Sequence, residues 1–160
     1  MVKAAFPGSF DPPTLGHLNL IKRASRLFDS LDVVIADNTQ KNHLLNADER
    51  VEIMEQMIRT AGIEHVNIVK WNSLVVDYAQ ANDIKVMVRG LRPLADFGYE
   101  FELSMINKHL NSNIETVFLP TDPQYFVLRA SVVRELIMLN GDVSNMVTPE
   151  VEALLKKKLL

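Results

Sequence analysis

The stretch VKAAFPGSFDPPTLGH, residues 2–17, joins a short apolar run to a turn-rich loop and then to the start of a helical pattern. Residues 2–6 are typical of a buried strand, which the prolines and glycines after it end. From residue 18 onward, apolar side chains recur at helical spacing. A strand, a loop and a helix in this order form the first half of a βαβ unit.

The rest of the chain repeats this order. Further strands are predicted at residues 31–36, 66–69, 86–88 and 116–119, and helices at 18–28, 46–61, 74–81, 97–110, 131–139 and from 148 onward. Asn46 and Glu49 indicate a capping box at the start of the helix over 46–61. Asn140-Gly141 ends the helix predicted over 131–139. Strict alternation predicts an α/β fold, a doubly wound five-stranded parallel sheet with helices on both faces.

Composition narrows the class of protein. The 160 residues are 48% hydrophobic, enough for a single domain over 1–160. With 17 basic and 20 acidic side chains the net charge is -3, which argues against general nucleic-acid binding. The absence of cysteine excludes disulfides, thiolate metal sites and cysteine nucleophiles. Without a membrane-length apolar run or a signal-peptide pattern, we expect a cytoplasmic protein with no membrane contact.

The loop after the first strand is the predicted phosphate site, because ligands of parallel sheets bind beyond the carboxyl ends of the strands. A helix N-terminus offers unpaired N–H groups, and Gly8 and Gly16 allow close approach of a backbone or a ligand. His17 can donate a hydrogen bond to a phosphate oxygen whether neutral or charged. It is therefore a candidate for stabilising a transition state; the alternative is a histidine satisfied by a local carbonyl.

Cationic side chains follow two other strands. Lys41 lies in a polar loop over residues 37–46, where its ammonium either neutralises a substrate phosphate or is simply solvated. Arg89 and Arg92 flank the end of the fourth strand, and their guanidinium forks suit phosphate oxygens. The alternative for both is a surface ion pair. After the fifth strand, Ser131 can cap a helix whose N–H groups also suit a nucleotide phosphate.

Other chemistries lack their signals. The four histidines are scattered, with no pair three or four residues apart on one helix, so no metal-binding residues are predicted. Neither the GxSxG turn of serine hydrolases nor the Walker motif GxxxxGK[ST] occurs, and the first loop has no GxGxxG. We therefore expect the chemistry of this protein to lie in the loops that follow the strands.

Two segments resemble a known family. The loop PGSFDPPTLGHL, residues 7–18, resembles the (H/T)xGH signature of the nucleotidylyltransferase superfamily, here at residues 14–17. The segment RGLRPLADFGYE, residues 89–100, resembles the hallmark of bacterial phosphopantetheine adenylyltransferases. The similarity also covers the chain length, the order of the motifs, the loop with Lys41 and the ending at residues 141–143, so it spans essentially the whole chain.

The resemblance implies a Rossmann-like fold, commonly in a homohexamer. It also implies transfer of the adenylyl group of ATP to 4′-phosphopantetheine, giving dephospho-coenzyme A and pyrophosphate in coenzyme A biosynthesis. The attacking phosphate is already ionised near neutral pH and needs no general base, so orientation and charge neutralisation supply the rate. Mg²⁺ with ATP is the implied cofactor, and coenzyme A is a candidate feedback ligand.

The resemblance also implies roles for single residues, and His17 would stabilise the pentacovalent α-phosphate. The ATP-binding residues would be Ser9, Phe10, His17, Gly90, Leu91, Arg92, Glu100, Tyr125, Phe126, Val127, Leu128, Arg129, Ala130 and Ser131. The phosphopantetheine site would be lined by Ser9, Lys41, Val75 and Arg89.

The chain departs from the family pattern in two places. Where the family usually has a serine-rich segment, this chain has Arg129 and Ala130 before Ser131. Arg129 either replaces hydroxyl hydrogen bonds to the triphosphate with charge or crowds the site. Gly98 stands where a polar residue is common, and we expect only a weaker local helix there.

Two other functions are compatible with the first loop. One is a transferase acting on nicotinamide mononucleotide, or one using CTP with glycerol 3-phosphate; the RGLR segment and its spacing to Tyr99 and Glu100 argue against both. The other is a non-catalytic nucleotide-binding or regulatory protein that lost the serine cluster. The presence of His17, Lys41 and both arginines argues against that.

Overall fold

The computed structural model describes residues 1–38, 40–92 and 94–160. Thr39, in the predicted loop with Lys41, and Pro93, in the RGLRPLADFGYE segment, lie outside the described residues. The strands are β1 (Lys3–Gly8), β2 (Ser30–Ala36), β3 (Val66–Trp71), β4 (Val86–Leu91) and β5 (Glu115–Pro120). The helices are α1 (Leu15–Ala24), α2 (Ala47–Thr60), α3 (Val75–Ala81), α4 (Leu94–Leu110), η1 (Pro123–Tyr125), α5 (Ala130–Met138) and α6 (Pro149–Leu159).

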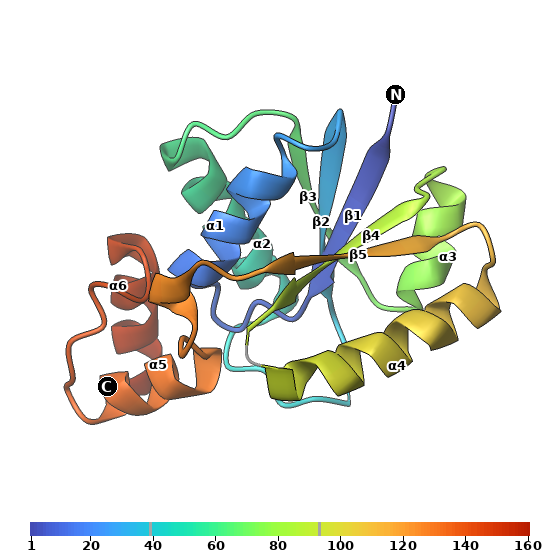
Figure 1. Cartoon of the computed structure of the whole chain (residues 1–160). Helices are drawn as coiled ribbons and strands as arrows, with labels where there is room; N and C mark the ends of the chain where they lie inside the picture. The colour runs from blue at the N-terminus through green and yellow to red at the C-terminus, as the bar shows by residue number, and fades with distance from the viewer. Residues whose placement is uncertain (39, 93) are drawn as a thin grey trace.

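The five strands form one parallel sheet in the order β3-β2-β1-β4-β5. Helices α1 and α2 lie on one face, and α3 and α4 on the other (Figure 1). The predicted Rossmann-like doubly wound fold is therefore confirmed. The strand order reverses its direction between β1 and β4. In sheets of this kind, ligands bind in the crevice beyond the carboxyl ends of the two strands at the reversal.

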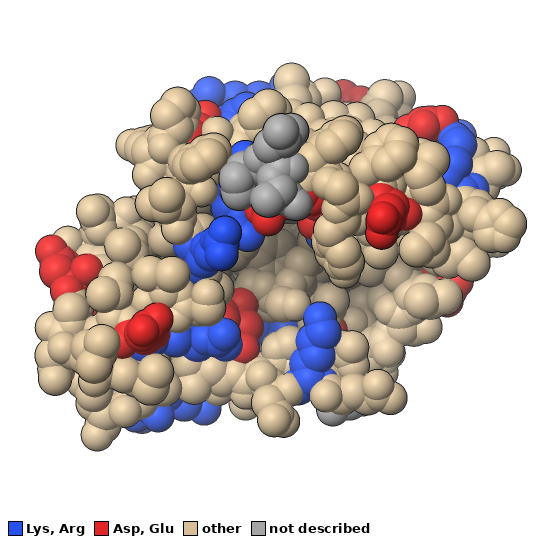
Figure 2. Space-filling view, turned by 60° about the horizontal axis from the view of Figure 1, so that its bottom comes forward, with Lys and Arg blue, Asp and Glu red and all other residues tan. Residues whose placement is uncertain are grey.

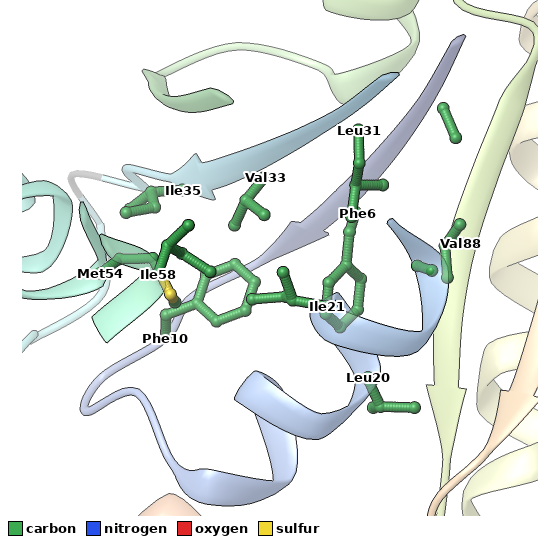
Figure 3. Close-up of a cluster of buried hydrophobic side chains, with 12 residues drawn as sticks. Phe6, Phe10, Leu20, Ile21, Leu31, Val33, Ile35, Met54, Ile58 and Val88 are labelled. Atoms are coloured by element: carbon green, nitrogen blue, oxygen red, sulfur yellow. The ribbon is translucent and has the colours of Figure 1, made fainter. Parts of the chain in front are cut away.

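Alternating side chains of the strands supply the two halves of the core, because successive residues of a strand point to opposite faces. Phe6 and Val33 pack with α1 and α2, whereas Ala5 and Val34 pack with α3. Figure 3 shows Phe10 reaching back from the loop after β1 into the first cluster, near Phe6 and Ile21. The loop that begins the predicted site is thus anchored in the core.

A third cluster holds α5 and α6 against α2. It contains Ile53 and Met57 of α2, Val133 and Ile137 of α5, and Val151 of α6, all buried. This packing brings the start of α5, which is remote in sequence from β1, to the carboxyl edge of the sheet (Figure 1).

Several element boundaries differ from the prediction. Helix α1 ends at Ala24, so the expected helical position of Leu27 is wrong and that side chain is 62% exposed. Helix α4 begins three residues earlier than expected, at residue 94, and α5 one residue earlier, at Ala130. Strand β4 continues to Leu91 because it pairs with β5 along its whole length, so Arg89 belongs to the strand itself. The capping box of Asn46 is confirmed.

Candidate active site

A cleft of about 480 Å³ opens at the carboxyl edge of the sheet, beside Gly8 at the end of β1 and Gly90 in β4. A smaller hollow of about 350 Å³ adjoins it, and both are lined by Ser9, Phe10 and His17. Figure 2 shows the hollowed face with Lys and Arg side chains on its rim. Loops that are distant in sequence thus meet at the edge where the fold predicts a ligand.

Most of the predicted site residues meet in these two cavities. The cleft is lined by Ser9, Phe10, His17, Arg89, Gly90, Arg92, Glu100, Tyr125, Leu128, Arg129, Ala130 and Ser131, and the smaller hollow by Lys41. Four predicted residues line neither: Leu91, Phe126, Val127 and Val75. Val127 is 75% exposed between η1 and α5, and Val75 begins α3 and packs against its buried cluster.

His17 is held by the N-terminus of its own helix. Thr14 is the N-cap of α1, and its backbone N–H donates to Nδ1 of His17 at 3.1 Å. The hydroxyl of Thr14 accepts from the backbone N–H of His17 at 3.3 Å. Because Nδ1 is an acceptor, a neutral ring must carry its proton on Nε2. The local hydrogen bond that the alternative reading expected therefore engages only one ring nitrogen, and it comes from an amide rather than a carbonyl.

The environment of His17 favours the uncharged ring. Burial, with a contribution from the nearby guanidinium of Arg92, lowers the pKa of His17 to about 4. The ring of Phe10 contacts the imidazole edge-on, with centroids 5.0 Å apart. At neutral pH this histidine is thus a neutral N–H donor rather than a cation.

The loop before α1 has an unusual backbone. Phe10 has a positive φ of 49°, and its side chain is nonetheless buried. A Cβ on Gly8 would lie 2.9 Å from the ring of Phe10, so the glycine is required by the folding back of this ring. At Gly16 a Cβ would make only ordinary contacts, the nearest at 3.5 Å. We expected both glycines to allow close approach of a backbone or a ligand; at Gly8 the structure shows instead that the side chain of Phe10 takes the space of a Cβ.

The two predicted arginines are already engaged with carboxylates. Nε and Nη2 of Arg89 donate to the two oxygens of Glu100 at 2.6 and 2.8 Å, and its Nη1 donates to the carbonyl of Pro7 at 2.8 Å. Arg92 donates to the carbonyl of Leu128 at 3.0 Å and lies 3.3 Å from Asp96. These pairs line the cleft and are partly buried, so they are not the solvated surface ion pairs of the alternative interpretation.

The start of α5 differs from the prediction. Arg129 is the N-cap, with an extended backbone (φ −127°, ψ 141°), and no side chain caps the helix. Ser131 lies at the second helical position, so the expected capping role of its hydroxyl is wrong. In the described part of the chain, neither Arg129 nor Lys41 forms an ion pair, and both face the cavities. The uncapped N–H groups and these two cations leave a positive region for an anion.

Several polar residues of the cavities were not assigned from the sequence: Asp11, Asp96, Thr121 and Arg134. Arg134 pairs with Asp11 at 3.4 Å across 123 residues of chain. Its position three residues after Ser131, on the same face of a helix, was a usable signal. The sequence offered no comparable signal for the partner that Asp11 would take.

The residues that the structure describes contain no group of three or more His, Asp or Glu side chains suited to a metal ion. The carboxylates of the cleft, Asp96 and Glu100, are both paired with arginines. These donors do not fit a metal held by the protein itself. None of the helices in the described segments combines the length and apolar character needed to cross a membrane.

Comparison with known proteins assigns the class first. The sequence model of the cytidylyltransferase-like family matches residues 5–136, so the fold and the site define a nucleotidyltransferase. Solved structures agree in fold: nicotinic acid mononucleotide adenylyltransferase of Plasmodium falciparum, complexed with NaAD, has a TM-score of 0.71 at 14% identity, covering 97% of this chain and 94% of that one.

Relatives then identify the family. Phosphopantetheine adenylyltransferase of Vesicomyosocius okutanii is 43% identical, covering 98% of each chain. The protein of that name from Treponema pallidum (strain Nichols) is 45% identical over the same shares of both chains. The chain belongs to the phosphopantetheine adenylyltransferase family.

Proposed function

We propose that the protein transfers the adenylyl group of ATP to 4′-phosphopantetheine, giving dephospho-coenzyme A and pyrophosphate. An oxygen of the acceptor phosphate attacks the α-phosphorus in line. The bond from that phosphorus to the oxygen that links it to the β-phosphate breaks, and this oxygen leaves as part of pyrophosphate. The observation that carries the proposal is the neutral His17, whose Nδ1 is occupied by Thr14. Its Nε2–H then serves as the donor to the pentacovalent α-phosphate, where charge develops.

The two cavities divide the proposed substrates. ATP would occupy the larger cleft, with its adenosine near β4 and η1 and its phosphates near the start of α5. The acceptor phosphate would enter beside Lys41 in the smaller hollow, which shares Ser9 and His17 with the cleft. The shared residues support a meeting point of the two phosphates. The roles of Val75, Phe126, Val127 and Leu91 stay predictions from the resemblance alone.

The separate substrate roles predicted for Arg89 and Glu100 need to be modified. The resemblance assigns Arg89 to phosphopantetheine and Glu100 to ATP, yet the two form a two-pronged ion pair. We propose that the pair holds both side chains in place between the substrates, because a guanidinium fixed at three donors loses little further freedom on binding.

Three further features are proposed from the family. Mg²⁺ would arrive with the triphosphate of ATP, where it neutralises phosphate charge, because the residues of the cleft offer cations rather than free carboxylates. Coenzyme A, which contains the product's structure, would compete for the same cleft as a feedback ligand. The protein would assemble as a homohexamer and act in the cytoplasm.

The proposed reaction is tested by pyrophosphate release with Mg²⁺ and either ATP or CTP, against 4′-phosphopantetheine, nicotinamide mononucleotide and glycerol 3-phosphate. We expect release only with ATP and phosphopantetheine. Release with another acceptor would keep the chemistry and change the substrate. Silence with every pair, together with measurable ATP binding, would favour the regulatory alternative and direct attention to Arg129 and Ala130.

His17→Ala tests the mechanism in the same assay. Because the contact is made in the transition state, turnover should fall by about 10²- to 10³-fold while ATP affinity changes little. His17→Gln, which keeps an N–H donor, should lose less. Equal losses in turnover and ATP affinity would remove His17 from the catalytic role.

A further inference from the structure

We propose that Arg50 and Asp11 are positioning residues, two buried side chains of opposite charge that clasp the loop carrying Ser9 to the loop carrying Lys41. This inference rests on the proposed function and deepens it. It concerns how the lysine beside the acceptor phosphate is held relative to His17.

Arg50 lies in the first turn of α2, and its side chain is completely buried. Its Nη1 donates to two carbonyls, of Ser9 at 2.9 Å and of Ala36 at 3.0 Å. Its Nε donates to the carbonyl of Leu45 at 3.1 Å, and its Nη2 to Asp37 at 3.0 Å. One guanidinium therefore joins the loop after β1, the end of β2 and the segment that leads into α2.

Asp11 lies in the loop that carries Ser9 and makes the reciprocal connection to the segment that leads into α2. It is 8% exposed, and its two carboxylate oxygens accept the backbone N–H groups of Leu44 at 2.8 Å and Leu45 at 2.9 Å. Leu45 is thus held on both sides, by Asp11 at its N–H and by Arg50 at its carbonyl. Neither loop can move along the other without breaking hydrogen bonds to a buried charge, which is costly.

The clasp bears on the reaction because both loops border the smaller hollow. Ser9, Asp11, His17 and Lys41 all line it. A buried arginine with a single carboxylate partner is a poor means of stabilising a core, where apolar side chains of similar size often do as well. Its specific use is to fix backbone positions, and misplacing a substrate-holding group by about 1 Å can cost about 10²-fold in rate.

The experiment uses Arg50→Lys, which keeps the charge but loses the fork, and Arg59→Lys as a control at an exposed position of the same helix. For Arg50→Lys we expect kcat/KM for phosphopantetheine to fall by about 10- to 100-fold, while the Kd for ATP measured alone changes less than about 3-fold. Arg59→Lys should behave as the unsubstituted protein. Equal effects of the two substitutions would overturn the proposal.

A double-mutant cycle with Lys41→Ala separates positioning from general stability. If Arg50 acts through the loop of Lys41, Arg50→Lys should have little further effect once Lys41 is removed. The same fold loss in both backgrounds would assign Arg50 a structural role only. Asp11→Asn is the second variant should Arg50→Lys fail to fold, and the same cycle applies to it.

A readout independent of activity is amide hydrogen exchange at Leu44 and Leu45. Exchange there should accelerate in both clasp variants but not in Arg59→Lys, because the loop opens locally. Unchanged exchange would contradict the clasp. A wild-type protein that releases no pyrophosphate would overturn the proposed function instead, and the exchange measurement would then decide the clasp by itself.

Discussion

His17 illustrates how much chemistry is set within four residues of chain. The N-cap geometry of Thr14 occupies Nδ1, and burial lowers the pKa of the ring to about 4. The imidazole is therefore neutral at physiological pH with its proton on Nε2. A neutral donor can stabilise charge that develops in a transition state without attracting every anion in the resting state.

The protonation state of His17 can be followed directly by NMR. In a proton NMR titration, the ring signal of His17 can be assigned by its loss in His17→Gln. This signal should stay at the position of the neutral ring as the pH falls from about 8 to about 6, and it should shift only near 4, because burial opposes the cation. A midpoint for His17 near the ordinary histidine value of about 6.5 would contradict the neutral ring.

Gly90 is needed for a steric reason. A Cβ there would lie 2.4 Å from Cδ1 of Leu20 on α1. Gly90→Ala should therefore lower the free energy of unfolding by about 1–3 kcal/mol, because a packed core does not absorb an added methyl group without strain. Urea unfolding measures it, and the cost should shrink in a Leu20→Ala background. An identical cost in both backgrounds would show that the contact with Leu20 is not the cause.

At the scale of elements, the site depends on where strands and helices stop. Strand β4 continues through Arg89 and Gly90 because β5 pairs with it to its end. Helix α5 begins at Ala130, with Arg129 as an N-cap that offers no capping side chain. These boundaries place the arginines and the open helix N-terminus at one edge of the sheet, where phosphates bind.

Helix α4 tests the link between sequence and element stability. Gly98 lies within it, and nothing would lie within 4 Å of an added Cβ. Gly98→Ala should raise the free energy of unfolding by about 0.5–1 kcal/mol, since glycine is a poor helix former. Gly62→Ala, equally open but at a φ of +61°, should destabilise, because alanine strains that backbone. Urea unfolding of both variants gives the two signs, and the same sign for both would refute the argument.

At the scale of the whole molecule, a polar network around the buried Asp32 lies on the opposite side of the sheet from α1. Asp32, in β2, accepts hydrogen bonds from Asn67 at 2.9 Å and Tyr78 at 2.9 Å, and Lys3 lies 2.9 Å away. Burial alone would raise the pKa of Asp32, but these three partners outweigh it and hold the pKa below its usual value. The network joins β1, β2, β3 and α3.

This network predicts a pH dependence of stability. Because the pKa of Asp32 is lower in the folded than in the unfolded state, its contribution is present above the unfolded pKa of about 3.9 and is lost as the pH falls through the folded value. Asp32→Asn should cost about 1–3 kcal/mol at pH 7 and flatten the fall of stability below about pH 4. Urea unfolding across this range checks both effects; an unchanged acid slope would exclude Asp32 as its origin.

Assembly is the other property of the whole molecule. Helix α4 leaves Tyr99, Phe101, Met105, Ile106 and Leu110 exposed. Several large apolar side chains exposed on one helix favour an association surface. In light scattering after size exclusion, Ile106→Glu should lower the mass of the proposed hexamer, whereas Leu27→Glu, at a 62% exposed position beyond α1, should not. A wild-type mass of one chain would end the hexamer proposal.

The sequence by itself determined the fold class and the motifs, because these depend on local patterns. Alternating strand and helix signals predicted the parallel sheet, and the segments around His17 and Arg89 pointed to adenylyl transfer. Most of the predicted residues do line the two cavities. Periodicity and short motifs are properties of neighbours in the chain, so they can be read without coordinates.

Only the tertiary structure decided the partners of the charged groups. Arg50 occupies a core position of its helix, but nothing in the sequence says that its guanidinium reaches Ser9 and Ala36. The pairing of Arg89 with Glu100, and of Arg134 with Asp11, likewise requires the folded chain. Hydrogen bonds depend on distances of about 3 Å between segments remote in sequence, and these distances exist only after the sheet and its loops have packed.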